Sequence, residues 1–268
     1  MDLLEAIVLG VLQGATEFLP VSSTAHLRIV PAVAGWEDPG ASFTAITQLG
    51  TVLAVLAYFA ADLARIASAV VREGRRPRSR DAVLGWYILA GTVPIVVLGV
   101  AFDDTIEDGA RDLTVIGITL IALGGLLWFA DRRVDGGRAL GDLTRRDAAI
   151  IGVAQAGALV PGVSRAGATL TAGLLVGLQR EAAARYSFLL SVPAVTAAGV
   201  YGLRDLGSGG LPGAAPTVVA TAVAVRVGLA TISGLLRFRS SHTVAPFVAY
   251  RVVLGIVVLA LSGSGTVT

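Results

Sequence analysis

The chain consists of long apolar runs separated by short polar segments. Six of these runs come close to, or exceed, the roughly 20 residues that a helix needs to cross a bilayer. They cover residues 41–61, 82–102, 113–130, 184–203, 214–236 and 244–262. The pattern therefore predicts six membrane-spanning helices, and Pro94 marks a kink in the second of them.

Two further apolar stretches are broken near their middles. Each half is too short to span a bilayer, and proline interrupts a helix because it lacks an N–H group and clashes with the preceding turn. We expect each stretch to form two half-helices that turn back within the membrane. The stretches are residues 3–19 and 21–35, divided by Pro20, and residues 147–160 and 163–178, divided by Pro161-Gly162.

The second half of the chain repeats features of the first at an offset of 142 residues. Gly10-Val11 and Gln13 align with Gly152-Val153 and Gln155, and Val21-Ser22 aligns with Val163-Ser164. Coincidence in a sequence rich in Ala, Val, Leu and Gly is the alternative explanation. Each half contains one broken stretch and three spans, and an odd number of crossings inverts the second half relative to the first.

We therefore expect a single membrane domain over residues 1–268, built from two inverted-topology repeats at about 1–135 and 143–268. Each repeat would be a re-entrant helix-turn-helix followed by three spanning helices. Folds of this kind place their functional site near the middle of the membrane, where broken helices from the two repeats meet.

Composition assigns the chain to the all-α integral membrane proteins. Hydrophobic residues make up 54% of the 268 positions and charged residues only 15%, with a mean hydropathy of +0.77. A soluble domain carries about one-quarter charged residues. The chain has no Cys and no Lys, which excludes disulfides, thiolate nucleophiles and phosphate-binding loops that need a lysine. The partner this composition predicts is the bilayer, and no nucleic acid is needed to explain the small positive charge.

The arginines predict the orientation in the plasma membrane. The loops at 62–82 and 131–147 contain six and five arginines, whereas the loop at 103–112 has one arginine among five acids. Short arginine-rich loops stay in the cytoplasm. The first broken stretch then enters from the outer face and the second from the cytoplasmic face, so that their tips meet within the membrane and both termini are extracytoplasmic.

Polar residues gather at the two breaks. Residues 13–28 read QGATEFLPVSSTAHLR, and charged groups inside a membrane are functional by default. The hydroxyls of Ser22, Ser23 and Ser164 follow the prolines and are suited to cap helix N-termini, whose free N–H groups and partial positive charge attract anions. Arg165 could grip a phosphate with two hydrogen bonds. The plainer alternative is that Arg165 neutralises Glu17.

Other polar groups near the first break predict acid–base and metal chemistry. Gln13 and Glu17 share a helix face, and their oxygens suit Mg²⁺ or Ca²⁺ if substrate oxygens complete the coordination shell. Ser23 and His26 are three residues apart and can approach each other in the first turn of the next half-helix. A histidine can activate a serine or a water molecule, or protonate a leaving group.

The two breaks resemble the signature motifs of bacterial undecaprenyl-diphosphate phosphatase of the bacitracin-resistance type. The first is Glu17-Phe-Leu-Pro-Val-Ser-Ser-Thr-Ala-His26, preceded by Gln13, and the second is Pro161-Gly-Val-Ser-Arg-Ala-Gly-Ala-Thr169. The likeness continues along the chain at Gln48-Leu-Gly50, Ser187-Phe-Leu-Leu190 and Pro246-Phe-Val-Ala-Tyr-Arg251.

This resemblance implies a membrane enzyme that removes the terminal phosphate of the C55 lipid carrier diphosphate with the help of a divalent cation. It also implies particular roles for the residues at the breaks. Gln13 and Glu17 would serve the metal and catalysis, Ser23 and His26 would be the nucleophile and the acid/base, and Ser164, Arg165 and Thr169 would bind phosphate, as Ser22 would.

The chain departs from the family pattern at two positions. Gln13 stands where some members have Glu, which weakens a metal site made of two carboxylates, and Ala166 stands where many members have a second Ser. Neither change removes the expected activity. The hydroxyl absent at Ala166 is therefore not required in a member with this pattern.

Several alternatives stay open at this point. An inverted-repeat bundle with an anion site could also be a transporter or a flippase for an anionic lipid or solute, although transport needs no nucleophile. A phosphatase of the phosphatidate-phosphatase type is disfavoured because its signature begins with Lys. Arg251 could pair with an acid or line the cavity, and Arg226 has no evident partner. The metal identity, the lipid chain length and the oligomeric state, a homodimer among the options, are open.

The predicted orientation can be tested with single cysteines, because the chain contains none. Cysteine at position 75 should react with a membrane-impermeant reagent only after the cells are opened, and cysteine at position 105 should react in intact cells. Labelling of position 75 from outside, or of position 105 only from inside, would reverse the orientation.

Overall fold

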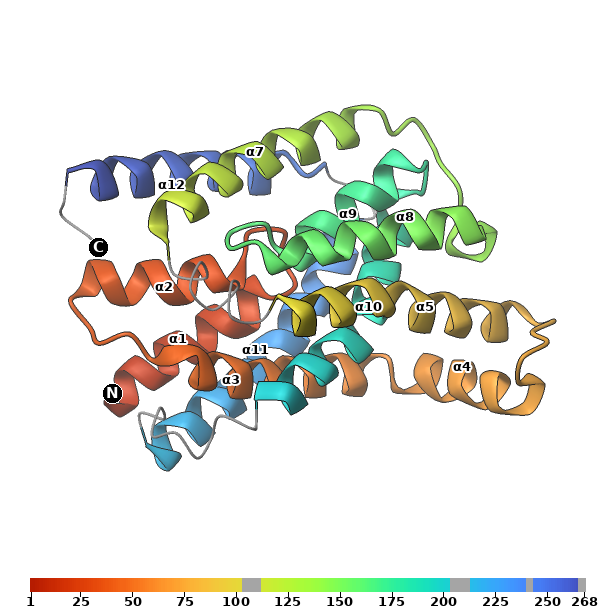
Figure 1. Ribbon diagram of the computed structural model, residues 1–268, viewed down its shortest axis with the longest axis horizontal. Helices are drawn as coiled ribbons and strands as arrows, with labels where there is room; N and C mark the ends of the chain where they lie inside the picture. The colour runs from red at the N-terminus through yellow and green to blue at the C-terminus, as the bar shows by residue number, and fades with distance from the viewer. Residues whose placement is uncertain (103–111, 203–212, 240–242, 265–268) are drawn as a thin grey trace.

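Helices make up nearly all regular structure in the computed structural model, which describes residues 1–102, 112–202, 213–239 and 243–264 (Figure 1). One isolated bridge pairs Arg138 with Leu178. The first half contains α1 (Leu3–Thr16), α2 (Ser23–Ala34), α3 (Gly40–Tyr58), α4 (Ala60–Glu73), α5 (Arg80–Ala101) and α7 (Leu113–Arg132). The second half contains the short turns η1 (Leu140–Asp142) and η2 (Gly157–Leu159) and the helices α8 (Arg145–Ala156), α9 (Arg165–Leu175), α10 (Arg180–Gly202), α11 (Ala214–Arg239) and α12 (Ala245–Gly263).

The helices confirm a polytopic membrane protein. By length and composition, five helices in the described residues can cross a membrane alone, namely α5, α7, α10, α11 and α12. A sixth span exists if α3 and α4 count as one, although they are bent by 82° at Phe59. Helix α5 continues through Pro94.

Both broken stretches form two half-helices, as the sequence predicts. Helix α1 ends at Thr16 and α2 begins at Ser23, whereas α8 and η2 end at Leu159 and α9 begins at Arg165. The four half-helices have only 11 to 14 residues each. A helix rises about 1.5 Å per residue, so each is too short to cross a hydrocarbon core about 30 Å thick.

The prediction of an arginine-rich loop at 62–82 is wrong for its first part, because residues Ala60–Glu73 form helix α4. Its apolar residues recur every three or four positions and give the helix one apolar face. Ile66 and Val70 on this face pack against α5, where Gly85 leaves room for them. The charges of the segment are consistent with a loop, but its apolar periodicity favours a helix.

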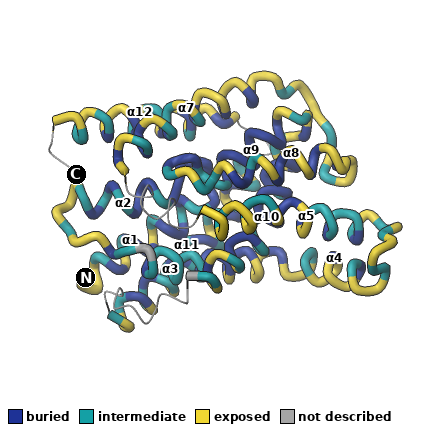
Figure 2. Tube along the Cα trace, in the orientation of Figure 1, coloured by how far each residue is buried: buried dark blue, intermediate teal, exposed yellow. Residues whose placement is uncertain are grey.

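Helix α10 occupies the middle of the bundle. Its span is 56% buried, against 22% for α5 and α12. Figure 2 shows buried residues concentrated around α8 and α9, with exposed residues along α4 and at the outer helices. Helix α9 is buried over nearly its whole length, whereas α8 exposes Ile150 and Val153 on one face.

The two halves pack against each other in exchanged pairs. Helix α1 packs on α11, α8 packs on α5, and α7 lies beside α12 (Figure 1). The contact of α8 with α5 is close enough that a Cβ atom on Gly152 would lie 2.6 Å from the Cα of Gly91. The first helix of each half thus packs on a later helix of the other half, as two related halves would do. The inverted repeat and its boundaries stay a prediction.

The start of α1 and the end of α12 lie at one end of the bundle, and the turn between α4 and α5 lies at the other (Figure 1). The side of the membrane on which the chain ends lie stays a prediction. The acidic residues Asp103, Asp104, Glu107 and Asp108, which the orientation argument used, lie outside the described residues.

Candidate active site

Glu17, the residue that follows α1, joins the two broken stretches. Its Oε1 accepts a hydrogen bond from Arg165 Nη2 at 2.8 Å, and its Oε2 accepts one from Ser23 Oγ at 2.7 Å. Gln13 donates from Nε2 to the same Oε2 at 3.1 Å. Because Ser23 begins α2 and Arg165 begins α9, the N-termini of two half-helices meet at one buried carboxylate.

Ser22 and Ser164 set the direction of these two helix starts. Both are N-cap residues and both have positive φ angles, 72° and 67°, a conformation that is uncommon outside glycine. Their hydroxyls accept hydrogen bonds from the backbone N–H groups of Ala25 at 3.4 Å and Gly167 at 3.1 Å. Each cap turns the chain sharply, so that the next residue, Ser23 or Arg165, reaches Glu17.

His26 bonds to Ser22 and Tyr250 rather than to Ser23. Its Nδ1 lies 2.6 Å from the Ser22 carbonyl oxygen, and its Nε2 lies 2.6 Å from the Tyr250 hydroxyl. A carbonyl oxygen can only accept, so Nδ1 carries the proton, and neutral Nε2 accepts from Tyr250. The base that contacts the Ser23 hydroxyl is therefore Glu17, and the expected contact between Ser23 and His26 is replaced.

Arg251 holds the two breaks together from within the bundle. Its side chain is 0% exposed, and Nη1 donates to the carbonyl oxygens of Pro20 at 3.0 Å and Val163 at 3.3 Å. Nη2 donates to Gly162 at 3.1 Å and Nε to Leu120 at 3.2 Å. The sequence left open whether Arg251 pairs with an acid or lines the cavity. The structure shows neither role, because backbone carbonyls at the breaks stabilise this cation.

The second break is also fixed to α7 by Thr119, whose hydroxyl donates to the Pro161 carbonyl at 2.6 Å. Gly162 has a φ of +82°, and a Cβ atom there would lie 2.1 Å from Thr119 Oγ1. Only glycine fits this position.

The hydroxyl of Thr169 serves the protein's own framework. It donates to the Arg165 carbonyl at 2.8 Å and lies 2.5 Å from Ser187 Oγ on α10. Like the capping hydroxyl of Ser164, it holds the helix start that carries Arg165, whereas the Ser22 hydroxyl caps α2. Direct binding of phosphate by these three hydroxyls stays a prediction.

A narrow cavity lies beside the pair of Glu17 and Arg165. Its volume is about 10 Å³, roughly the room needed for a single water molecule. Ser187 and Ser191 of α10 and Thr51 of α3 contribute polar groups to its wall. A phosphate group does not fit without movement of these walls, so the structure shows the site closed.

Two buried polar atoms at this site have no hydrogen-bond partner within the described residues, Arg165 Nη1 and Gln13 Oε1. Such atoms are costly unless a ligand uses them. Arg165 Nη1 is suited to a phosphate oxygen. No cluster of three or more His, Cys, Asp or Glu residues gathers in the described part of the chain. A divalent cation at Gln13 Oε1 and Glu17 would therefore have to take its other oxygens from the substrate, and this cation stays a prediction.

The fold and the site together define a polytopic membrane protein in which a carboxylate, a serine hydroxyl and a guanidinium meet where two broken helices come together. The family model for the bacitracin resistance protein BacA matches residues 6–257. The chain belongs to this family.

Relatives of the chain carry a common name. An undecaprenyl-diphosphatase of a Nocardioides species is 51% identical over 271 residues, which cover 100% of this chain and 99% of the relative. An undecaprenyl-diphosphatase of Thermobifida fusca is 49% identical, and the match covers 100% of this chain and 93% of the relative. One of Prosthecochloris aestuarii is 48% identical, and the match covers 100% of this chain and 99% of the relative.

Sequence reasoning missed Tyr250, Ser187 and Thr119. Each lies in a spanning helix, far along the chain from the residue that it contacts, and a single hydroxyl in an apolar run carries little signal. The sequence offered one hint, because Tyr250 precedes a buried arginine within Pro246-Phe-Val-Ala-Tyr-Arg251. Arg226 is exposed on α11.

The role of Arg251 can be tested by Arg251→Lys and Arg251→Met. Lysine keeps the charge but cannot donate in all the directions that a guanidinium does, and each buried carbonyl left without a donor costs on the order of 1–3 kcal/mol. We expect a lower melting temperature in detergent for both variants, with turnover reduced by about tenfold or more. Arg226→Lys is the control, and equal behaviour of the lysine variants would contradict the assigned role.

Proposed function

We propose that the chain hydrolyses undecaprenyl diphosphate to undecaprenyl phosphate and inorganic phosphate at the Glu17 cluster. The hydrogen bonds of one buried carboxylate to Ser23 on one side and Arg165 on the other carry this proposal. They place a nucleophile, a base and an anion-binding group at one point, as phosphoryl transfer requires. The product is the lipid carrier of cell-wall synthesis, and its recycling gives resistance to bacitracin.

Ser23 is the proposed nucleophile. Glu17 Oε2 takes the proton of the Ser23 hydroxyl while Oγ attacks the terminal phosphorus. The bond between this phosphorus and the bridging oxygen breaks, undecaprenyl phosphate leaves, and the phosphoryl group remains on Ser23. Attack by Ser23 explains why its hydroxyl contacts the carboxylate, whereas a purely capping hydroxyl is already provided by Ser22.

Arg165 neutralises the phosphoryl oxygens during this transfer. Its free Nη1 can bind one oxygen at once, and its Nη2 can exchange the Glu17 carboxylate for a second. A divalent cation, Mg²⁺ or Ca²⁺, held by Gln13 and Glu17 would add positive charge at the phosphate. Positioning and electrostatics of this kind supply most of the acceleration in phosphoryl transfer.

His26 is the proposed base of the second step, in which water attacks the phosphorus on Ser23 and releases phosphate. The Nε2 lone pair of His26 is directed at the Tyr250 hydroxyl. Tyr250 is 47% exposed, so a water molecule can take the place of its hydroxyl or pass a proton through it. The Ser22 carbonyl keeps the ring oriented by holding Nδ1–H.

The apolar spans place this chemistry in a membrane. The plasma membrane, with extracytoplasmic termini, and a homodimeric assembly are further predictions of the sequence. The transporter alternative finds less support, because relatives that match the whole chain are named as diphosphatases and transport does not require a serine bound to a carboxylate.

The first functional prediction concerns Arg165→Lys. An ammonium keeps the charge but is a point charge, and it cannot replace the planar, two-pronged hydrogen bonding of a guanidinium to two phosphate oxygens. We expect most of the phosphate release to be lost, with little change in melting temperature. Arg180→Lys is the control, because Arg180 forms an ion pair with Asp131 away from the site. Normal turnover by Arg165→Lys would make Arg165 a structural counter-ion only.

The second functional prediction separates Glu17, Ser23 and His26. Glu17→Ala should abolish activity and its dependence on divalent cations together. Ser23→Ala and His26→Ala should each lower turnover by about a hundredfold or more, because base catalysis contributes about 10² to 10⁴. Ser68→Ala, on the exposed face of α4, should turn over normally.

Mass spectrometry identifies the nucleophile. A phosphoserine at position 23 should accumulate in His26→Ala, because the first step proceeds while water attack is slowed. If no phosphoserine forms and Ser23→Ala still releases phosphate, water is the nucleophile and Ser23 only begins the helix.

A further inference from the structure

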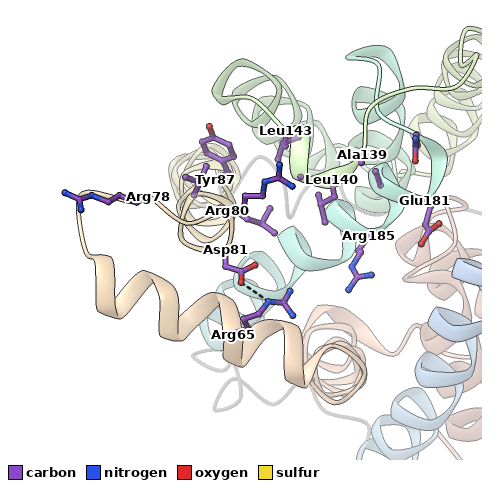
Figure 3. Close-up of a pocket in the computed structure, with 15 residues that line it drawn as sticks. Arg65, Arg78, Arg80, Asp81, Tyr87, Ala139, Leu140, Leu143, Glu181 and Arg185 are labelled. Carbon is purple, nitrogen blue, oxygen red and sulfur yellow. Dashed lines mark hydrogen bonds and ion pairs between the residues drawn. The ribbon is translucent and has the colours of Figure 1, made fainter.

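A second and larger cavity lies at the arginine-rich end of the bundle. It measures about 530 Å³ and is bounded by the turn between α4 and α5, the segment around η1 and the start of α10 (Figure 3). Within the described residues it shares no lining residue with the cavity at Glu17. Ligand sites commonly occupy about 300–1,000 Å³, so this cavity has room for a ligand headgroup.

The lining carries more positive than negative charge. Arg80 extends toward Leu140 and Leu143, whereas Arg78 points away from the cavity (Figure 3). Gly141 leaves space for the Arg80 side chain, because a Cβ atom there would lie 3.2 Å from Arg80 Nη1. The charged residues of the lining are Arg65, Arg78, Arg80, Arg185, Asp81 and Glu181.

The arginines are held in place before any ligand binds. Arg65 Nε bonds to Asp81 Oδ2 at 2.8 Å, and Arg65 Nη2 lies 3.0 Å from Asp62 Oδ1. Arg185 bonds to the other oxygen of Asp62. These bonds already fix two guanidinium groups, so little side-chain entropy is lost when a ligand binds. Arg80 forms no ion pair with the described residues that line the cavity.

Glu73 fixes the turn that leads to Arg80. It accepts hydrogen bonds from the backbone N–H groups of Arg78 at 2.5 Å and Ser79 at 2.9 Å. The Ser79 hydroxyl and these N–H groups lower the pKa of Glu73 to about 2. The carboxylate is therefore ionised at neutral pH, and the start of α5 is held in position.

Two tryptophans at this end of the bundle favour a position of the cavity at the depth of lipid headgroups. Trp86, six residues after the start of α5, donates from Nε1 to the Gly74 carbonyl at 2.7 Å. At the same end of the bundle, Arg132 stacks over Trp128 at 4.4 Å. Tryptophans mark the interface between membrane and water. The remaining wall is apolar, with Val83 and Leu84 on α5.

We propose that this cavity binds the headgroup of an anionic glycerophospholipid, with its phosphate at Arg80 and its acyl chains along the apolar wall. Basic pockets between helices at a membrane surface bind such headgroups. A free phosphate ion shares the same charge chemistry but has no use for the apolar wall. The lipid would bridge α4 and α5 to η1 and α10.

Native mass spectrometry of the purified full chain tests the proposal, because mass distinguishes bound lipid from bound phosphate. The probes are dioctanoyl phosphatidylglycerol, dioctanoyl phosphatidylcholine and inorganic phosphate. We expect one phosphatidylglycerol to bind roughly fivefold or more tightly than phosphatidylcholine, and inorganic phosphate not to displace it.

Two variants probe the cavity by different means. Arg80→Gln removes the unpaired charge and should weaken phosphatidylglycerol binding by about fivefold. Gly141→Leu keeps every charge but fills the space beside Arg80, and it should weaken binding at least as much. Arg76→Gln is the matched control, because it removes an arginine of the same turn outside the lining, and it should bind as the wild type does.

Other outcomes would overturn the proposal. An equal loss in Arg76→Gln would reveal diffuse surface attraction, and unchanged binding in both cavity variants would exclude the cavity. Loss of the lipid in Glu17→Ala would place it in the active site. Binding of inorganic phosphate in its stead would identify an ion site without a lipid.

Discussion

The hydrogen bonds from Arg251 to backbone carbonyls are the constraint on which both breaks depend. A helix that stops inside a membrane leaves carbonyl groups without partners, and each is costly where water is absent. One guanidinium provides donors for Pro20 of the first break and for Gly162 and Val163 of the second. Its charge is balanced by these carbonyl dipoles, so Glu17 needs no part in neutralising it and is left to the active site.

The catalytic cluster follows from this alignment. With the breaks fixed, the capped starts of α2 and α9 bring Ser23 and Arg165 to the two oxygens of Glu17. The closed cluster is an internal ion pair. In the proposed mechanism, an incoming diphosphate competes with Glu17 for Arg165, and the carboxylate that it releases is then freer to take the proton from Ser23. Substrate binding would thus also activate the proposed nucleophile.

Much of this arrangement follows from local sequence. Proline does not stop every helix, because Pro31, Pro94 and Pro193 lie inside α2, α5 and α10. The breaks at Pro20 and Pro161-Gly162 were predictable because hydroxyl residues suited to capping follow them. Five of the six predicted spans are single helices, and the other corresponds to the bent pair of α3 and α4. Glu17 and Arg165 stood out because charge inside a membrane is rare. Helix α4 was missed because its arginines resemble a loop, although the spacing of Ile66 and its apolar neighbours carries the helical signal.

The partners of the polar groups were decided by the tertiary structure alone. His26 was expected to serve Ser23, three residues away, but it bonds to Tyr250, 224 residues along the chain. Arg251 reaches Pro20 over 231 residues. The sequence by itself determined which segments are helical and which residues are too polar to face lipid, because both depend on the residue and its near neighbours. Which of those polar residues meet was set by the packing of helices from opposite halves, and that depends on shapes that no local pattern records.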